Sequence, residues 1–183
     1  MTHADLEAAL GEARRGDEWA ITLLFRSIQP QLLRYLGRQA PGAAEDLAAE
    51  TWLAVAQGIA RFEGSLSDFR ALVFTIARRR VVDHYRRQDR RPVEGPLAEG
   101  TEGHDRDAGE IAIAALSTQQ AIDYLVEALP AAQAEVVLLR VVADLSVEEV
   151  ARVMGRSAGA VRILQHRALR KLEQHFKIEG VTN

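Results

Sequence analysis

The sequence of 183 residues contains no cysteine. This absence excludes disulfide bonds, thiolate metal sites and a thiol redox switch within the chain, and it is typical of a reducing compartment. No apolar run approaches the roughly 20 residues that a membrane-spanning helix needs. The N-terminal stretch MTHADLEAALGEARRGDEWA alternates charged and apolar residues, unlike the uninterrupted apolar core of a signal peptide. We therefore expect a soluble, cytoplasmic protein that does not insert into a membrane.

Sequence patterns of catalysis and metal binding are missing as well. The chain contains no Gly-rich phosphate loop, no HExxH motif and no serine in a nucleophile-elbow setting. Its five histidines do not have the spacing of metal ligands, and surface or DNA-facing positions suit them better. We therefore expect a protein that is not an enzyme and has no metal site and no cofactor.

The residues that are abundant favour helices. Aromatic residues make up only 5% of the chain, whereas alanine, leucine, valine and arginine dominate it. The hydrophobic content of 48% can fill the core of one mid-sized domain or of two small ones. The composition therefore predicts an all-α protein.

The formal net charge of −3 conceals a strong segregation of charge along the chain. Residues 78–91 carry seven arginines against two aspartates, and residues 152–177 carry seven basic side chains against one acidic side chain. Between them, residues 92–151 hold twelve acidic and two basic side chains. Two basic segments separated by an acidic one predict two contact points for a polyanion, although an Arg-rich helix can also be a simple solvated face.

Apolar periodicity predicts helices throughout residues 1–91. Gly16 and Asp17 should separate a short N-terminal helix from a longer one, which Pro30 should interrupt or restart. The stretch PGAAEDLAAETWLAVAQGIARF has acids in its first turn, where the helix dipole favours them. In SDFRALVFTIARRR the apolar residues recur at helical spacing up to the arginines. The side chains expected to be buried in these two helices are Leu47, Trp52, Val55 and Ile59, and Phe69, Leu72, Val73 and Ile76.

Residues 92–115 differ in composition from both flanking segments. The stretch PVEGPLAEGTEGHDRDAGE contains two prolines, four glycines, six acids and no aromatic residue, so it cannot bury enough apolar surface to fold. We interpret these residues as an acidic, flexible linker. The predicted architecture is two small helical domains, residues 1–91 and 116–177, joined by this linker and followed by a tail, 178–183.

The C-terminal segment has the pattern of a helix-turn-helix. Ser146 and Glu149 match a capping box before the short helix VEEVARVM, Gly155 supplies the turn, and Ser157 caps a longer basic helix. A helical wheel gives the longer helix an apolar side (Val161, Leu164, Ala168, Leu169, Leu172 and Phe176) and a basic side (Gly159, Ala160, Arg162, Ile163, His166, Arg167 and Arg170). Ile163 on the basic side fits a thymine methyl in a major groove, but an ordinary exposed isoleucine is an equally good interpretation.

Three blocks of sequence follow one another between residues 17 and 176. They are EDLAAETW with FRALVFTIARRRVVDHYRR, then the acidic linker, then LPAAQAEVVLLRVVADLSVEEVARVMGRSAGAVRILQHRALRKL. In this order and spacing they resemble the extracytoplasmic-function (ECF) class of the bacterial sigma-70 family. The resemblance implies an ECF-type sigma factor, which binds core RNA polymerase, recognises the -35 and -10 promoter elements and promotes promoter melting and transcription initiation.

For residues 1–91 the resemblance implies a sigma-2 domain. It places Asp46 and Glu50, one helical turn apart, and Trp52 on the beta-prime clamp helices of the polymerase. The loop RFEGSLSDFR matches the loop that pockets a flipped base of the -10 element, with Phe62 and Ser65 as candidate contacts. The residues placed along the -10 DNA are Arg78, Arg79, Arg80, Arg86 and Arg87. Alternatively, the two acids stabilise a helix start and Phe62 belongs to the core.

For the C-terminal segment the resemblance implies a sigma-4 domain, whose last helix enters the major groove of the -35 element. The residues placed on this DNA are Ser157, Ala160, Arg162, Ile163, His166 and Arg167. The resemblance also implies contact with the polymerase beta flap and a linker that runs near the RNA exit path. Members of this class are usually held inactive by an anti-sigma factor, and we expect such a partner here.

Two other functions agree with parts of the sequence. A promoter-specific repressor or activator would use the helix-turn-helix without joining the polymerase, but it leaves residues 42–91 unexplained. The protein could also be a helical adaptor that binds only proteins, but the two basic segments would then have no role and would be there by chance. Polymerase binding by the isolated fragment 1–91 would separate the sigma factor from both alternatives.

Overall fold

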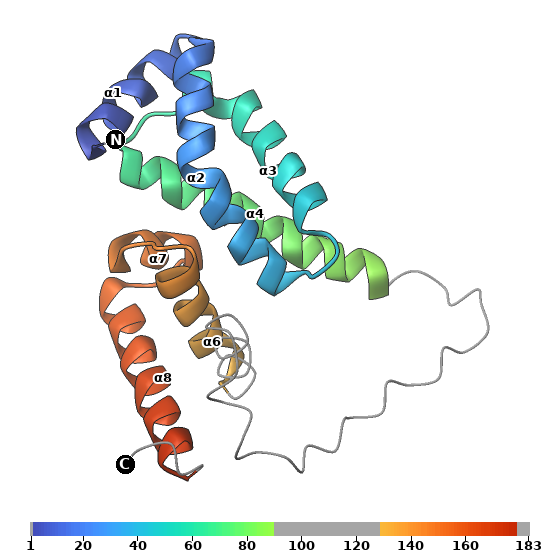
Figure 1. The fold of residues 1–183 in the computed structure, drawn as a ribbon, viewed down its shortest axis with the longest axis vertical. Helices are drawn as coiled ribbons and strands as arrows, with labels where there is room; N and C mark the ends of the chain where they lie inside the picture. Colours follow the sequence, from blue (N-terminus) through green and yellow to red (C-terminus); the bar gives the residue numbers. More distant parts are fainter. Residues whose placement is uncertain (1, 90–128, 179–183) are drawn as a thin grey trace, which may run out of the picture.

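Figure 1 shows the fold in a computed structural model that describes residues 2–89 and 129–178. Within these ranges every regular element is a helix, in agreement with the predicted all-α class, and none is long and apolar enough to cross a membrane. In chain order the elements are α1 (His3–Arg14), α2 (Glu18–Gln39), α3 (Ala44–Gly58), a 3₁₀ turn η1 (Ile59–Arg61), α4 (Leu66–Asp89), α6 (Ala131–Val137), a π-helical turn η3 (Leu138–Val142), α7 (Val147–Met154) and α8 (Ala158–Ile178). The predicted linker, 92–115, lies outside the described residues, as does the predicted tail after its first residue.

The boundary between α1 and α2 lies where the sequence predicts it. Gly16 adopts a φ of +87°, a left-handed conformation that glycine enters without steric cost. Asp17 then caps α2, because its Oδ1 accepts a hydrogen bond of 2.7 Å from the backbone N–H of Ala20. These two residues end one helix and begin the next within a single turn of chain.

Pro30 does not interrupt α2, so this prediction was wrong. The helix is continuous from Glu18 to Gln39 with Pro30 inside it. A proline inside a helix removes one backbone hydrogen bond and costs about 3 kcal/mol. Burial of Leu24 and Ile28 before the proline, and of Leu32 and Leu36 after it, offsets this cost, since each fully buried side chain of this size contributes about 1.5–3 kcal/mol.

The stripe predicted on α4 is only part of the buried surface of this helix. Phe69 and Val73 are fully buried as predicted, whereas Leu72 and Ile76 are half-buried. Phe74, which the stripe omits, is completely buried. The buried arc is wider than one stripe because α4 packs against α2 and α3 and, in addition, against α7.

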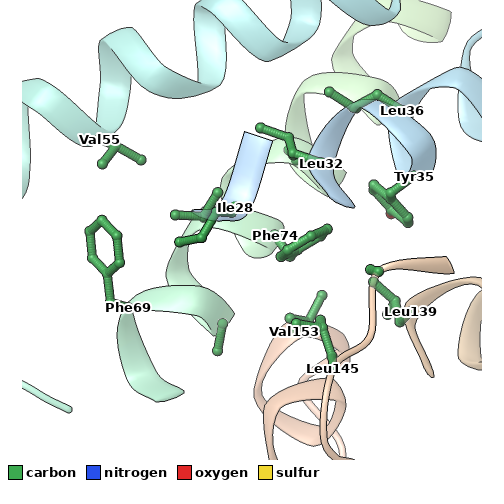
Figure 2. Packing of buried hydrophobic residues seen from close by; sticks show 14 of the residues in the cluster. Ile28, Leu32, Tyr35, Leu36, Val55, Phe69, Phe74, Leu139, Leu145 and Val153 are labelled. Carbon is green, nitrogen blue, oxygen red and sulfur yellow. The ribbon is translucent and has the colours of Figure 1, made fainter. Parts of the chain in front are cut away.

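One continuous cluster of buried side chains joins the two halves of the chain. Figure 2 shows Tyr35 of α2 and Phe74 of α4 facing Leu139, Leu145 and Val153 of the C-terminal half. The two rings meet edge to face, with centroids 5.6 Å apart. The two predicted domains are therefore in direct contact through a shared core.

Charged side chains of α4 border this shared core. Arg70 donates a hydrogen bond of 2.7 Å to the carbonyl of Asp144, and its Nε lies 3.6 Å from the carboxylate of Glu149. Glu149 is only 4% exposed, and it also accepts a hydrogen bond of 2.6 Å from the backbone N–H of Ser146. A buried carboxylate needs such partners, because an unpaired charge in the interior is strongly destabilising.

The helix-turn-helix has the local signals predicted for it. Ser146 and Glu149 form the capping box of α7, and Gly155 ends this helix in the left-handed conformation, with a φ of +62°. The hydroxyl of Ser157 accepts a hydrogen bond of 3.2 Å from the backbone N–H of Ala160 and so caps α8. These residues define where α7 begins and ends and where α8 begins.

The helical wheel placed Leu169 on the apolar side of α8, but this residue is 50% exposed, so the prediction that it is buried was wrong. Val161, Ala168 and Leu172 are buried, and the last two pack with Leu129 against α6. Within the described residues α8 packs mainly against α6 and α7, and its buried arc there is narrower than the apolar side of the wheel. The side chain of Phe176 lies outside the described residues.

We predict that Leu145→Ala destabilises the N-terminal half as well as its own. Deleting a completely buried leucine costs about 2–5 kcal/mol, and Leu145 belongs to the shared core. Both tryptophans lie in the N-terminal half, so a chemical denaturation followed by tryptophan fluorescence should show a lower midpoint. Val141→Ala, at a position 62% exposed in the same half as Leu145, should change the midpoint little. An unchanged fluorescence midpoint for Leu145→Ala would contradict the shared core.

Candidate functional site

The two acidic side chains of α3 that were predicted as binding contacts are both accessible to solvent. Asp46 is exposed, and the side chain of Glu50, one turn further on, is 40% exposed. The Oε2 of Glu50 lies 3.6 Å from Arg80 and 3.9 Å from Arg87, both on α4. Exposed pairs of this kind stabilise a fold by only about 0–1 kcal/mol. The structure therefore brings one predicted acidic contact together with two of the predicted basic contacts.

Trp52 is half-buried and packs toward α2. The centroids of its ring and of the Phe25 ring are 5.0 Å apart, and its indole N–H donates a hydrogen bond of 2.6 Å to Gln29. Phe25 and Leu53 remain 38% and 62% exposed. Sequence analysis did not single out these two residues, because α2 and α3 are apolar on more than one side and periodicity alone does not tell which side stays open.

The loop between η1 and α4 is tightly built. Phe62 is half-buried and meets Phe69 of α4 edge to face, with centroids 5.6 Å apart. Gly64 adopts a φ of +156°, and a Cβ there would lie 2.9 Å from atoms of both Phe62 and Asp68. Ser65, which is exposed, caps α4, since its hydroxyl oxygen accepts a hydrogen bond of 3.2 Å from the backbone N–H of Asp68. The same hydroxyl donates a hydrogen bond of 2.7 Å to the carboxylate of Asp68. This side-chain hydrogen bond, together with one from the Ser65 backbone, holds the pKa of Asp68 below its ordinary value.

Two residues of α1 also contact this loop, and sequence analysis missed both. Arg14 donates a hydrogen bond to the carbonyl of Gly64, and the backbone N–H of Leu66 donates one of 2.9 Å to Glu7. The partners are 50 and 59 residues apart in the sequence. Such long-range contacts leave no periodic or local signal that could have predicted them.

The predicted basic contacts on α4 differ in their exposure. Arg79, Arg86 and Arg87 are exposed, and Arg80 is half-exposed. Arg78 instead faces α6, where its Nε lies 2.5 Å and its Nη2 3.2 Å from the two carboxylate oxygens of Glu135. The hydrogen bond to this carboxylate raises the pKa of Arg78 above its ordinary value. Arg78 therefore takes part in the contact between the two halves of the chain. Its position within the run of arginines did not predict this contact.

The basic side predicted for α8 faces solvent. Arg162, His166 and Arg167 are exposed, and Ile163 is 55% exposed among them. Arg162 makes an ion pair of 2.9 Å with Glu148 of α7, in which both side chains are more than half exposed. An exposed apolar side chain between cations is suited to a surface that carries both charge and methyl groups, such as a DNA groove.

At the N-terminal end of this basic side of α8, Ser157 is exposed and Ala160 is half-buried. Ser157 directly precedes α8 and Ala160 lies in its first turn, and the capping hydrogen bond joins the two residues. Within the described ranges, no three histidine, aspartate or glutamate side chains are grouped so that they could hold a metal ion.

Comparisons with known proteins agree with this arrangement. The family model for sigma-70 region 2 matches residues 24–91, and that for sigma-70 region 4 matches residues 119–172. The ECF RNA polymerase sigma factor SigD of Mycobacterium tuberculosis is 34% identical over 183 residues, which cover 96% of this chain and 85% of the relative. The ECF RNA polymerase sigma factor ShbA of Streptomyces griseus is 37% identical over 175 residues, covering 90% of this chain and 92% of that one.

Solved structures share the fold. A structure of CnrH in complex with the cytosolic domain of CnrY matches 94% of this chain and 97% of its own, with a TM-score of 0.68 and 20% identity. The sigma factor RpoE of Bartonella quintana, crystallised with the anti-sigma factor NepR, matches 86% of this chain and 97% of its own, with a TM-score of 0.60 and 20% identity. At this identity the likeness concerns the fold alone.

We predict that Gly64→Ala distorts the loop before α4. The added Cβ would meet Phe62 and Asp68 at 2.9 Å, in a backbone conformation that other residues rarely adopt, so the free energy of unfolding should fall by about 1–3 kcal/mol. Gly58→Ala is the matched control, because nothing lies within 4 Å of its Cβ at the end of α3. Thermal denaturation of the two variants should therefore give clearly different midpoints, and equal midpoints would contradict the close packing at Gly64.

Proposed function

The chain belongs to the ECF class of the sigma-70 family of RNA polymerase sigma factors, and from this membership we propose how its residues divide the work of transcription initiation. In this proposal the protein joins core RNA polymerase in the cytoplasm, and its C-terminal domain recognises the -35 element. Its N-terminal domain captures and opens the -10 element. It acts as an initiation factor without turnover chemistry of its own. The observation that carries the proposal is the presence of two separate basic surfaces, on α4 and on α8, beside exposed acids of α3.

We propose that Asp46, Glu50 and Trp52 contact the clamp helices of the polymerase beta-prime subunit. The exposure of Asp46 supports this role, and so does the weakness of the pairs that hold Glu50. An acid held by exposed pairs of at most about 1 kcal/mol can exchange them for a polymerase cation at little cost. The beta flap would be contacted by the C-terminal domain.

The basic surface of α4 would follow the backbone of the -10 DNA. This role is supported by the full or partial exposure of Arg79, Arg80, Arg86 and Arg87. The loop that would receive a flipped base contains Phe62 and Ser65. Extruding a base costs a few kcal/mol, which stacking and hydrogen bonds in the loop have to recover. Phosphate contacts made by several arginines make the affinity strongly dependent on salt.

Recognition of both elements requires the two halves to separate. The names of the two elements give their positions in base pairs before the start of transcription. The elements therefore lie about 25 base pairs apart, or about 85 Å at 3.4 Å per pair. A compact protein of this length is only about 40 Å across. In the packed arrangement Arg78 is also taken up by Glu135. We therefore infer that Arg78 reaches the -10 DNA only after α6 and α7 leave α4.

We also propose that an anti-sigma factor controls this protein. RpoE of Bartonella quintana was crystallised with the anti-sigma factor NepR, which supports the same kind of partner here. Exposed apolar side chains on α2 and α3 are suited to such a protein surface. They are Trp19, Phe25 and Leu53, which are 68%, 38% and 62% exposed.

The test of polymerase binding is run-off transcription with purified core polymerase on genomic promoter fragments. Asp46→Ala combined with Glu50→Ala should reduce initiation at defined sites at least about tenfold, which corresponds to 1.4 kcal/mol of lost docking energy. Glu45→Ala, an exposed acid at the start of the same helix, is the matched control and should retain most activity. Specific DNA binding by the chain alone, without polymerase-dependent initiation, would point to a stand-alone regulator and contradict the proposal.

The test of -35 recognition compares Arg162→Ala with Arg170→Ala, two exposed arginines of α8. A bidentate arginine contributes about 1–3 kcal/mol of discrimination at one guanine, so Arg162→Ala should relax base preference at one position. Arg170→Ala should weaken binding to all sequences about equally. Holoenzyme binding to a library of -35 variants measures both effects, and an unchanged preference for Arg162→Ala would remove that residue from the recognition surface.

A further inference from the structure

The loop of residues 62–65, between η1 and α4, is held in place by contacts with α1, which lies far from it in the sequence. The guanidinium carbon of Arg14 lies 5.4 Å from the centroid of the Phe62 ring, a cation–π contact. The same guanidinium donates a hydrogen bond to the carbonyl of Gly64. One side chain of α1 therefore fixes both the aromatic ring and the backbone of the loop.

The Phe62 ring and the start of α4 are also held by other contacts. Phe62 meets Phe69, a completely buried residue of α4, and Glu7 of α1 accepts a hydrogen bond from the first backbone N–H of that helix, at Leu66. Phe62 thus lies between a fixed ring and a fixed cation. Removing Arg14 would leave the ring anchored on one side only.

Close packing makes the position of the loop sensitive to this anchor. At Gly64 there is no room for even one additional carbon atom, because Phe62 and Asp68 already lie 2.9 Å from where it would be. A shift of the Phe62 ring toward Gly64 would therefore press on the backbone there and on the capping residue that follows it.

We propose that Arg14 of α1 is a positioning residue for -10 recognition, which sets the loop of residues 62–65 in the shape that accepts a flipped base. This inference rests on the proposed function of the loop. The role is indirect, since Arg14 acts through Phe62 and Gly64. A loop of fixed shape discriminates between bases, because a base that does not fit it cannot make the same contacts, whereas a loop that can change its shape adapts to several bases and binds them with similar affinity.

The experiment measures binding of the reconstituted holoenzyme to partly single-stranded promoter DNA in which each -10 position carries each of the four bases. Arg14→Met, which keeps the length of the side chain but removes its charge and its donors, should reduce discrimination at the flipped position about tenfold. Arg14→Lys retains a cation and a donor and should keep most of the wild-type discrimination. Affinity for core polymerase and for a DNA duplex with only the -35 element should stay unchanged in both variants.

Arg15→Met is the matched control, because the neighbouring Arg15 makes its ion pair with Glu12 on the surface of α1 and has none with the loop. It should behave as wild type. Wild-type discrimination in Arg14→Met would overturn the positioning role, and so would an equal loss of affinity for every base, which indicates a merely structural residue. Failure of the wild-type protein to initiate with core polymerase would instead overturn the proposed function itself, so the two failures can be told apart.

Discussion

The contact of α4 with the C-terminal half is the interaction on which the rest of the arrangement depends. It places Phe74 and Tyr35 against Leu145 and its neighbours in a region closed to water. Apolar burial of this kind stabilises by about 1.5–3 kcal/mol for each large side chain, far more than the exposed ion pairs contribute. Because the same helix carries the basic run further along, the packing of its first turns decides how that run is presented.

Charge and packing have different roles at this contact. The buried carboxylate of Glu149 has a hydrogen bond and an arginine beside it, so its pairing mainly avoids a penalty. Arg78 and Glu135, by contrast, lie at the border, where water can reach the arginine. A border pair of this kind is broken more easily than the apolar core, so the proposed separation of the two halves would have to overcome mainly the core.

Local chemistry was predictable from the sequence, and tertiary choices were not. Ser146 and Gly155 stand where a cap and a turn were predicted, and Asp17 stands where a break between two helices was predicted, because each acts on a backbone only a few residues away. Pro30 and Leu169 were misjudged, since the number of neighbours around a helix determines whether a break is tolerated or an apolar residue is buried. The residues that the family resemblance implied can be located in the fold, and the roles of these residues stay predictions.

Glu50 lies within ion-pair distance of two of the arginines proposed to hold the promoter, and in the proposed function this position would couple two binding events. A polymerase surface that takes up the carboxylate leaves Arg80 and Arg87 without their acid, and a phosphate that takes up these arginines leaves Glu50 without its cations. By thermodynamic reciprocity each partner then improves the affinity for the other by the same factor. With pairs of at most about 1 kcal/mol each, the factor is severalfold for each pair. If both proposed contacts form, the affinity for DNA would be severalfold higher after the polymerase has been recruited than before.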